Sequence, residues 1–204
     1  MTVEAGLPSP TEGPLGRLLE GLERLLSETP RTEEPESDSP AERARDIGRR
    51  AAKKAGLVSG GLALPPGPFG YVTIIPDLMV IWKIQAQMVA DLAGTFGKKA
   101  FLGREQMLYC LFRHAAAQVM RDVVIRVGER AIIRRASLGV IQRIPPRIGV
   151  RIGQRLAGGA IARWLPVAGA LGVGAYAYYD TRQVAATAID LFRREIALVG
   201  ELDE

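Results

Sequence analysis

The first clear pattern in the chain is a leucine repeat near the N-terminus, which predicts a short amphipathic helix over residues 15–26. Its apolar positions are spaced mostly three or four residues apart, with charged residues between them: Leu15, Leu18, Leu19, Leu22, Leu25 and Leu26. A helix of about three turns is only marginally stable alone in water. We therefore expect this leucine face to dock on another surface, either a partner protein or the body of the same chain.

The remaining pattern predicts an all-α helical bundle. A basic helix is expected over residues 40–60 and an apolar helix over residues 76–95. A third helix is expected over residues 104–135 and a final one over residues 180–199. Strand patterns with alternating β-branched residues are nearly absent.

Small residues dominate the segment that precedes the last helix. Ala168 and Gly172 are four residues apart, as are Ala170 and Gly174, and this spacing lets two helix backbones approach closely. We expect the bundle to contain a central apolar helical hairpin. The Gly-rich segment 158–179 is a hairpin that could enter a bilayer.

Charge is distributed unevenly and divides the chain into a tail and a body. Residues 1–46 carry eleven acidic residues and five arginines, whereas the rest carries eleven acidic residues and twenty-two lysines and arginines. Residues 1–14 lack periodicity, and residues 27–40 are acidic and proline-rich. We therefore expect a disordered acidic tail over residues 1–40, containing the docking helix, and one all-α domain over residues 41–204.

The chain shows no clear membrane span or export signal. No positive charge precedes an apolar run at the N-terminus, so we do not expect a secretory signal. The sixteen uncharged residues over 164–179 fall short of the roughly 20 that a spanning helix needs. The single cysteine, Cys110, excludes an intrachain disulfide and favours a reducing compartment. We expect a cytoplasmic protein, peripheral or integral at the inner membrane.

Arginines recur every four residues in two parts of the basic body, which would place each set on one face of a helix. The two sets are Arg126, Arg130 and Arg134, and Arg147, Arg151 and Arg155. Both lie beside isoleucines and leucines, a pattern typical of helices on an anionic membrane surface. A solvated face is the alternative. We do not expect nucleic acid as a partner, because no aromatic residues are interleaved and no recognition motif is present.

Candidate catalytic or metal-binding residues are few. His114, the only histidine, lies four residues after Cys110, so the two would share a helix face. A zinc site needs about four ligands, and no other cysteine or histidine exists to supply them. Asp77 is a lone carboxylate in an apolar stretch, and its place at a helix start favours a capping role. We expect no enzyme activity, no metal and no cofactor.

A set of small-residue and proline motifs is spread over the body: Lys54-Ala55-Gly56, Pro68-Phe69-Gly70, Pro76-Asp77, Gln85 through Ala93, Gly97 and Pro166-Val167-Ala168-Gly169-Ala170. Over roughly residues 44–195, this set resembles the EcsC family of helical proteins. It is also similar to a helical domain that often follows small GTPase domains, although GTFGKK at residues 94–99 lacks the spacing of a phosphate-binding loop. The resemblance implies a bacterial, membrane-associated protein and carries over no catalytic residues.

Together these patterns favour a non-catalytic, membrane-associated or adaptor protein. Its predicted surfaces are the leucine face of the N-terminal helix for a protein partner and the two arginine sets for an anionic membrane. The alternative is a helical protein that inserts into and permeabilises membranes through residues 158–179. The small-residue face also offers a contact for a homo-oligomer.

Overall fold

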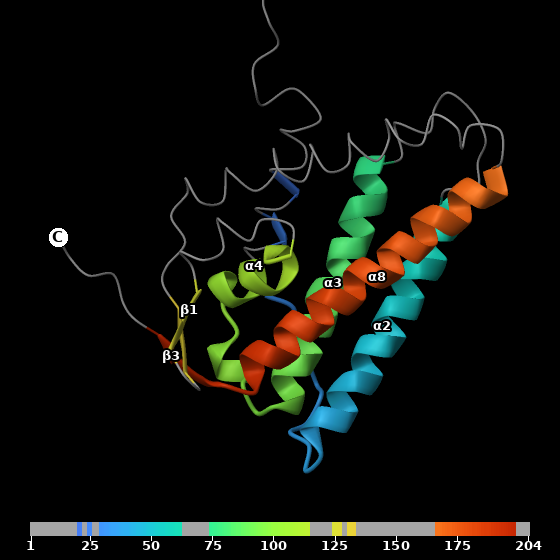
Figure 1. Ribbon diagram of the computed structural model, residues 1–204. Helices are drawn as coiled ribbons and strands as arrows, with labels where there is room; N and C mark the ends of the chain where they lie inside the picture. The colour runs from blue at the N-terminus through green and yellow to red at the C-terminus, as the bar shows by residue number, and fades with distance from the viewer. Residues whose placement is uncertain are drawn as a thin grey trace, which may run out of the picture.

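A computed structural model of the protein describes residues 20–21, 24–25, 29–62, 74–114, 124–127, 130–133 and 166–198. Its body consists of the long helices α2 (Pro40–Leu62), α3 (Ile74–Thr95) and α8 (Pro166–Phe192), with the shorter α4 (Arg104–Phe112) packed against α3 and α8. A single 3₁₀ turn, η2 (Lys99–Phe101), leads into α4. Figure 1 shows the three long helices side by side. This bundle confirms the predicted all-α class.

The main hydrophobic core lies where α3, α4 and the second half of α8 meet. The rings of Trp82 and Phe112 join α3 to α4, edge to face, with their centroids 5.3 Å apart. Aliphatic and aromatic residues from the three helices fill the interior: Met88, Leu92, Met107, Leu108, Leu111, Leu191 and Phe192. At the end of α3, Gly97 adopts a positive φ of 65°, which ends the helix as the sequence predicts.

Helices α2 and α8 run antiparallel in close contact, because glycines face each other between them. A Cβ atom on Gly174 would lie 2.7 Å from the carbonyl oxygen of Gly56 and 3.3 Å from the Cα atom of Gly60. Further along, a Cβ atom on Gly48 would lie 3.0 Å from that of Ala185. The backbones can approach this closely only because no side chain stands between them. Close packing through Gly174 is therefore confirmed.

Residues 29–39, here called the strap, form an extended segment along the C-terminal half of α3. The backbone N–H of Ser37 donates to the carbonyl oxygen of Thr95 at 3.1 Å. Gly94 leaves room for the strap, since a Cβ atom there would lie 2.6 Å from the carbonyl oxygen of Glu34. The strap differs from the solvated linker expected over residues 27–40, because the last turn of α3 offers unsatisfied carbonyl groups and a glycine-sized gap.

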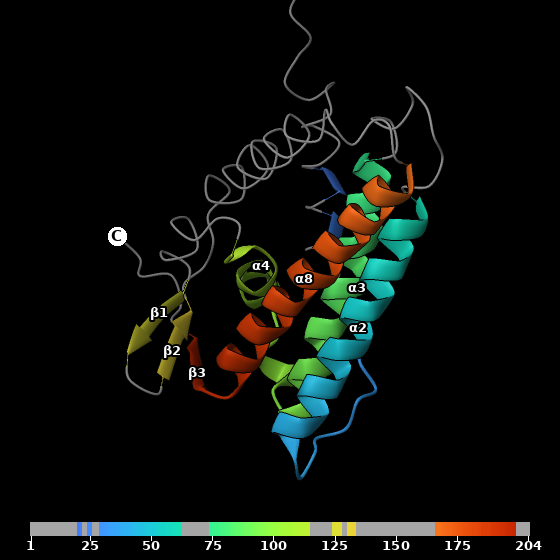
Figure 2. The same cartoon turned by 45° about the vertical axis from the view of Figure 1, so that its right-hand side comes forward.

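Three strands of four residues each form a small sheet beside α4 and the end of α8 (Figure 2). β1 (Val124–Val127) pairs antiparallel with β2 (Arg130–Ile133), and β2 pairs parallel with β3 (Glu195–Leu198). The sequence analysis did not predict these strands. Valine and isoleucine flank Gly128 and Glu129 in this stretch, and β-branched residues favour paired strands over a helix.

Several predicted helices therefore need correction. α4 ends at Phe112 instead of near residue 135, and α8 ends at Phe192 instead of near residue 199. Arg126 lies in β1 and Arg130 begins β2, so the helical arginine face predicted over 126–134 is wrong. Arg134 and the second set, residues 147–155, lie outside the described residues.

The Gly-rich segment 158–179 is not a hairpin in its described part. From Pro166 onward it is the first half of α8, which continues through Tyr179 and Asp180 without a break. Pro166 suits the first position of a helix, and no glycine or proline occurs after Gly174 to interrupt it. None of the described helices has an apolar stretch of the length that crossing a bilayer requires.

A matched pair of glycine substitutions in α8 tests the contact with α2. Gly174→Ala should lower the free energy of unfolding by about 1–3 kcal/mol, because the new methyl group would collide with the backbone of α2. Gly172→Ala is the control, since nothing lies within 4 Å of a Cβ atom there. It should raise stability by about 0.5–1 kcal/mol through helix propensity. Equal stabilisation of both variants in urea denaturation would contradict the close contact.

Candidate functional site

A cluster of polar side chains inside the bundle is centred on Asp180 of α8. Oδ1 of Asp180 lies 2.8 Å from Nε2 of His114, which follows α4, and accepts from the Tyr176 hydroxyl at 2.9 Å. Oδ2 accepts from Nε2 of Gln85 on α3 at 2.8 Å, and the same amide donates to the Thr181 hydroxyl at 3.2 Å. One carboxylate therefore links three helices.

The electrostatics of the cluster favour a charged Asp180. Burial alone would raise the pKa of this carboxyl group, since its side chain is only 14% exposed. The hydrogen bond and electrostatic attraction of His114, together with hydrogen bonds from Gln85 and Tyr176, outweigh that effect and hold the pKa of Asp180 below its ordinary value of 3.8. Because both carboxylate oxygens already accept hydrogen bonds, the geometry indicates a structural link between helices.

Cys110 lies in α4, four residues before His114, and is fully buried. Burial raises the pKa of its thiol far above the ordinary value of 9.0. The thiolate that acts as a nucleophile or metal ligand is therefore not formed at neutral pH. Within the part of the chain that the structure describes, no three His, Cys, Asp or Glu side chains are grouped as metal ligands.

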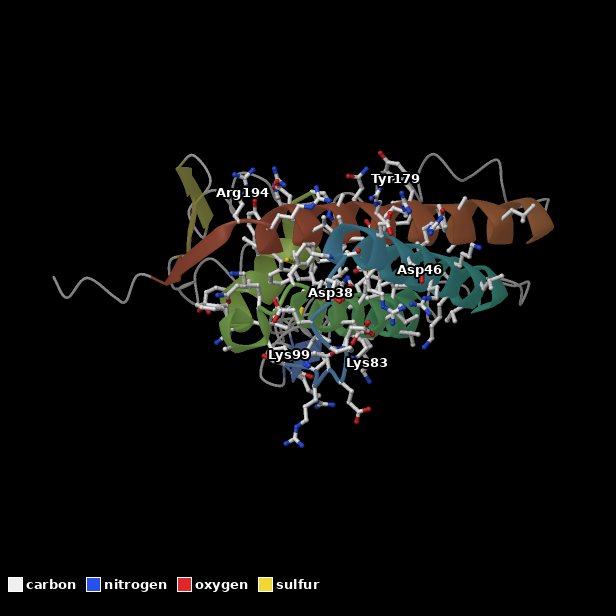
Figure 3. All side chains as sticks on the ribbon, turned by 90° about the horizontal axis from the view of Figure 1, so that it is seen from below. Asp38, Asp46, Lys83, Lys99, Tyr179 and Arg194 are labelled. Carbon is white, nitrogen blue, oxygen red and sulfur yellow. The ribbon has the colours of Figure 1, made fainter. Side chains whose placement is uncertain are left out.

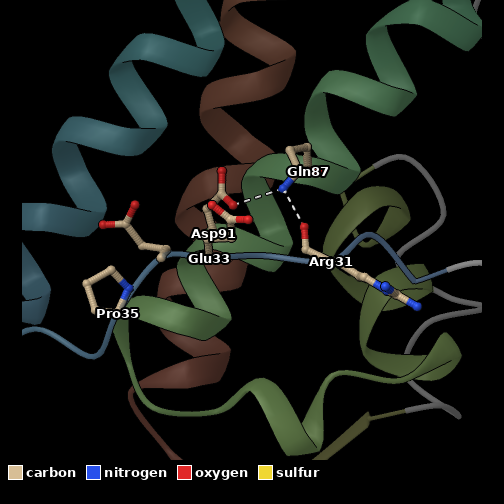
Figure 4. Close-up of a pocket in the computed structure, with 6 residues that line it drawn as sticks. Arg31, Glu33, Pro35, Gln87 and Asp91 are labelled. Carbon is tan, nitrogen blue, oxygen red and sulfur yellow. Dashed lines mark hydrogen bonds between the residues drawn. The ribbon is translucent and has the colours of Figure 1, made fainter.

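A shallow pocket of about 460 Å³ lies where the strap crosses α3 (Figure 4). Nε2 of Gln87 donates to the carbonyl oxygen of Arg31 and to Oδ1 of Asp91, both at 3.0 Å. The hydroxyl of Thr32 donates to the same Asp91 oxygen at 2.7 Å. These polar groups hold the strap on α3, so the pocket is part of the contact between the strap and the helix.

The outer surface of α2 and α8 carries exposed cations, here called the basic face. Its members are Arg49, Arg50, Lys53 and Lys54 of α2 and Arg182 of α8. Asp46 pairs with Arg49 at 3.5 Å and with Arg50 at 3.0 Å. Lys53 and Lys54 form no ion pair with any described residue, and α2 contains no acidic residue after Asp46. Among the described residues, Lys53, Lys54 and Arg182 therefore carry positive charge that no ion pair neutralises.

On the opposite side of the bundle, under the strap, acidic and basic side chains are more evenly matched. Figure 3 shows Tyr179 on the α8 side and Lys83 and Lys99 on the far side. There the strap supplies acidic groups to the cations around it. Glu34 pairs with Arg43, and this hydrogen bond, aided by the positive charges of Arg43, Arg50 and Lys99, holds the pKa of Glu34 below its ordinary value. The strap thus compensates the cations beside it, including Arg50 at the edge of the basic face, and Lys53 and Lys54 keep no ion pair with any described residue.

The structure places two of the predicted surfaces differently from the sequence analysis. Leu25 is only 9% exposed and belongs to the main core, and a Cβ atom on Gly21 would collide with Met79 of α3. This part of the N-terminal helix packs on the body of the same chain, which was the alternative to a partner protein. The other leucines of the repeat lie outside the described residues, and binding of a partner stays a prediction.

Sequence reasoning missed both the Asp180 cluster and the strap contact. A signal for the cluster exists, since Asp180 ends a run of sixteen uncharged residues and Gln85 lies within an apolar helix. Polar residues in such surroundings need hydrogen-bond partners. The sequence predicts that α2 is a basic helix. Only the fold shows which side of the bundle its cations occupy.

The Asp180 cluster predicts a specific dependence of stability on pH. Asp180→Asn should lower the free energy of unfolding at pH 7 by about 1–3 kcal/mol, since hydrogen bonds to a charged group are lost. The folded-state pKa lies below the unfolded one, so this stabilisation is full above about pH 4 and is lost as the pH falls further. Urea denaturation from pH 7 to pH 3 should show the difference from the wild type shrinking at the acidic end.

A surface carboxylate on the same helix provides the control. Asp190 pairs with Arg194 at 3.0 Å and Arg113 at 3.7 Å, and Asp190→Asn should cost less than about 1 kcal/mol. A constant difference between the wild type and Asp180→Asn across the whole pH range would contradict an ionised, hydrogen-bonded Asp180.

Comparison with known proteins identifies no relative: no protein-family model matches the chain, and no curated protein or solved structure shows significant similarity to it. The resemblance to the EcsC family therefore remains a prediction from the sequence motifs.

Proposed function

We propose that this chain is a non-catalytic protein that binds anionic membrane surfaces peripherally through its basic face. The observation that carries the proposal is the exposed cationic surface of α2 and α8, in which Lys53 and Lys54 have no acidic partner among the described residues. Anionic headgroups are a fitting partner, because lysine and arginine side chains near a negatively charged leaflet are attracted without a specific pocket.

The size of this attraction defines what kind of binding to expect. The basic face has five cations, and its net charge is about +4 when Asp46, the described carboxylate that pairs with them, is counted. At about 1 kcal/mol for each charge, the attraction amounts to about 4 kcal/mol, which is binding in the millimolar range. Such binding is reversible and weakens with salt, because ions screen exposed charges beyond about 10 Å.

The polar cluster and the buried thiol support the non-catalytic part of the proposal. Asp180 is engaged by donors from three helices, and the pKa of Cys110 is raised by burial, so neither offers a reactive group. An adaptor role through the N-terminal helix is a further element of the proposal. It would use the leucines of the repeat other than Leu25, which the core already buries.

Charge reversal on the two sides of the bundle tests the proposal. The double variant Lys53→Glu/Lys54→Glu should lose more than tenfold in binding to vesicles containing phosphatidylglycerol, measured by flotation at low salt. The control Lys98→Glu/Lys99→Glu changes the net charge equally on the strap side. It should bind within about threefold of the wild type, because those positions lie away from the basic face.

Two results would contradict peripheral anionic binding. One is a wild-type protein that does not float with anionic vesicles at low salt, and the other is an equal loss in both double variants. Release of a trapped dye from the vesicles would instead favour the membrane-permeabilising alternative.

A further inference from the structure

Large apolar side chains are exposed at one end of the bundle. Figures 1 and 2 show that the end of α2 and the starts of α3 and α8 lie together there. Leu57 of α2 is 78% exposed and Leu171 of α8 is 69% exposed, and Val173 and Val80 are more than one-third exposed. These four residues are here called the apolar tip.

Leu57 and Leu171 lie on the same outer side of the α2–α8 contact. Gly56 and Gly174 face each other across that contact, and successive helical residues are rotated by about 100°. Leu57 follows Gly56 by one residue, and Leu171 precedes Gly174 by three residues. Because the two helices are antiparallel, these offsets turn both side chains toward the same outer side of the pair. Leu57 and Leu171 are therefore exposed on one side of the α2–α8 pair, whereas Val173, about 200° from Leu171 around α8, faces another side.

Tyrosines lie next along α8, moving away from the tip. Tyr176, Tyr178 and Tyr179 are all more than one-third exposed, and Tyr179 points away from the bundle in Figure 3. Tyrosine has an apolar ring and a polar hydroxyl group, and is enriched where a bilayer's hydrocarbon meets its headgroups.

Cations flank this end on all three helices, and on α2 they lie level with the tyrosines of α8, because Gly56 packs against both Gly174 and Tyr178. Lys53 and Lys54 lie about one turn from Leu57, Lys83 lies one turn from Val80, and Arg182 follows the tyrosines. Because α2 runs in the opposite direction to α3 and α8, its lysines precede its leucine in the sequence. In space, the cations of each helix nevertheless lie farther from the tip than its exposed apolar side chain, which one helix's composition alone would not produce.

Acidic residues are scarce in these half-helices. Residues 53–62, 74–90 and 166–179 contain one, Asp77 in the first turn of α3, where the helix dipole favours a negative charge. On the side of α3 near Met79, the exposed residues Glu20 and Arg24 carry opposite charges. Among the described residues, the tip end therefore presents exposed apolar side chains, then tyrosines and cations at a common level, with one acidic residue in these three half-helices.

We infer that the bundle binds the bilayer end-on, with the apolar tip inserted shallowly among the headgroups of an anionic membrane. This inference rests on the proposed membrane binding and adds the mode and the contacting end. The arrangement, with apolar side chains nearest the tip and tyrosines and cations together behind them, matches a membrane interface, where acyl chains give way to headgroups and an anionic surface. A second copy of the chain fits less well, because the same cations would face each other across the contact.

An environment-sensitive fluorophore tests which end meets the lipid. The variant Leu171→Cys can be labelled selectively with a nitrobenzoxadiazole dye, because Cys110 is fully buried and Leu171 is an exposed position. Vesicles of equal parts phosphatidylcholine and phosphatidylglycerol should raise the emission of this label several-fold and shift it to the blue. The matched control is Ala186→Cys, an exposed position four turns further along α8, whose emission should stay unchanged.

Flotation of the same labelled samples separates the two proposals. Flotation with no response at residue 171, or with an equal response at residue 186, would overturn end-on insertion while leaving membrane binding intact. No flotation would overturn the proposed function and the tip insertion with it. A response at residue 171 that depends on protein concentration and needs no vesicles would show that a second copy or another protein surface covers the tip, and would overturn the inference.

Discussion

The close antiparallel contact between α2 and α8 is the constraint on which the rest of the structure depends. Gly56 and Gly60 on one helix and Gly174 on the other remove the side chains that would hold the backbones apart. The contact places the lysines of α2 beside the tyrosines of α8 and brings both helix ends to one side. Without it, the basic face and the apolar tip would not form.

Two polar contacts fix the remaining parts of the bundle to this pair. Asp180 ties α8 to Gln85 of α3 and to His114 after α4, which sets the rotation of α8 about its own axis. The strap binds the opposite side of α3 and neutralises cations there. Lys53 and Lys54 keep no ion pair among the described residues, and this directs our functional proposal to α2 and α8.

The sequence predicts the all-α class and the extents of α2 and α3 well, because capping residues and glycines act locally. Gly97 is an example, since its positive φ confirms the predicted end of α3. The helix expected over residues 124–133 is wrong because arginines four residues apart fit a helix face, whereas the β-branched valines and isoleucines of this stretch form paired strands. The sequence does not predict the strap contact, because Gly94 contacts Glu34, which lies sixty residues earlier in the chain. The need for a glycine at this position follows only from that contact.

Hydrogen–deuterium exchange in the presence of anionic vesicles tests the central claim most directly, namely that one end of the bundle contacts the membrane. The first-turn amides of α3 and α8 have no acceptor within their helices and should exchange quickly in solution. Our account predicts that vesicles slow exchange at residues 74, 75, 77 and 167–169 and leave the strap, residues 29–39, unchanged. Slower exchange confined to the strap, or no change at either helix start, would contradict it.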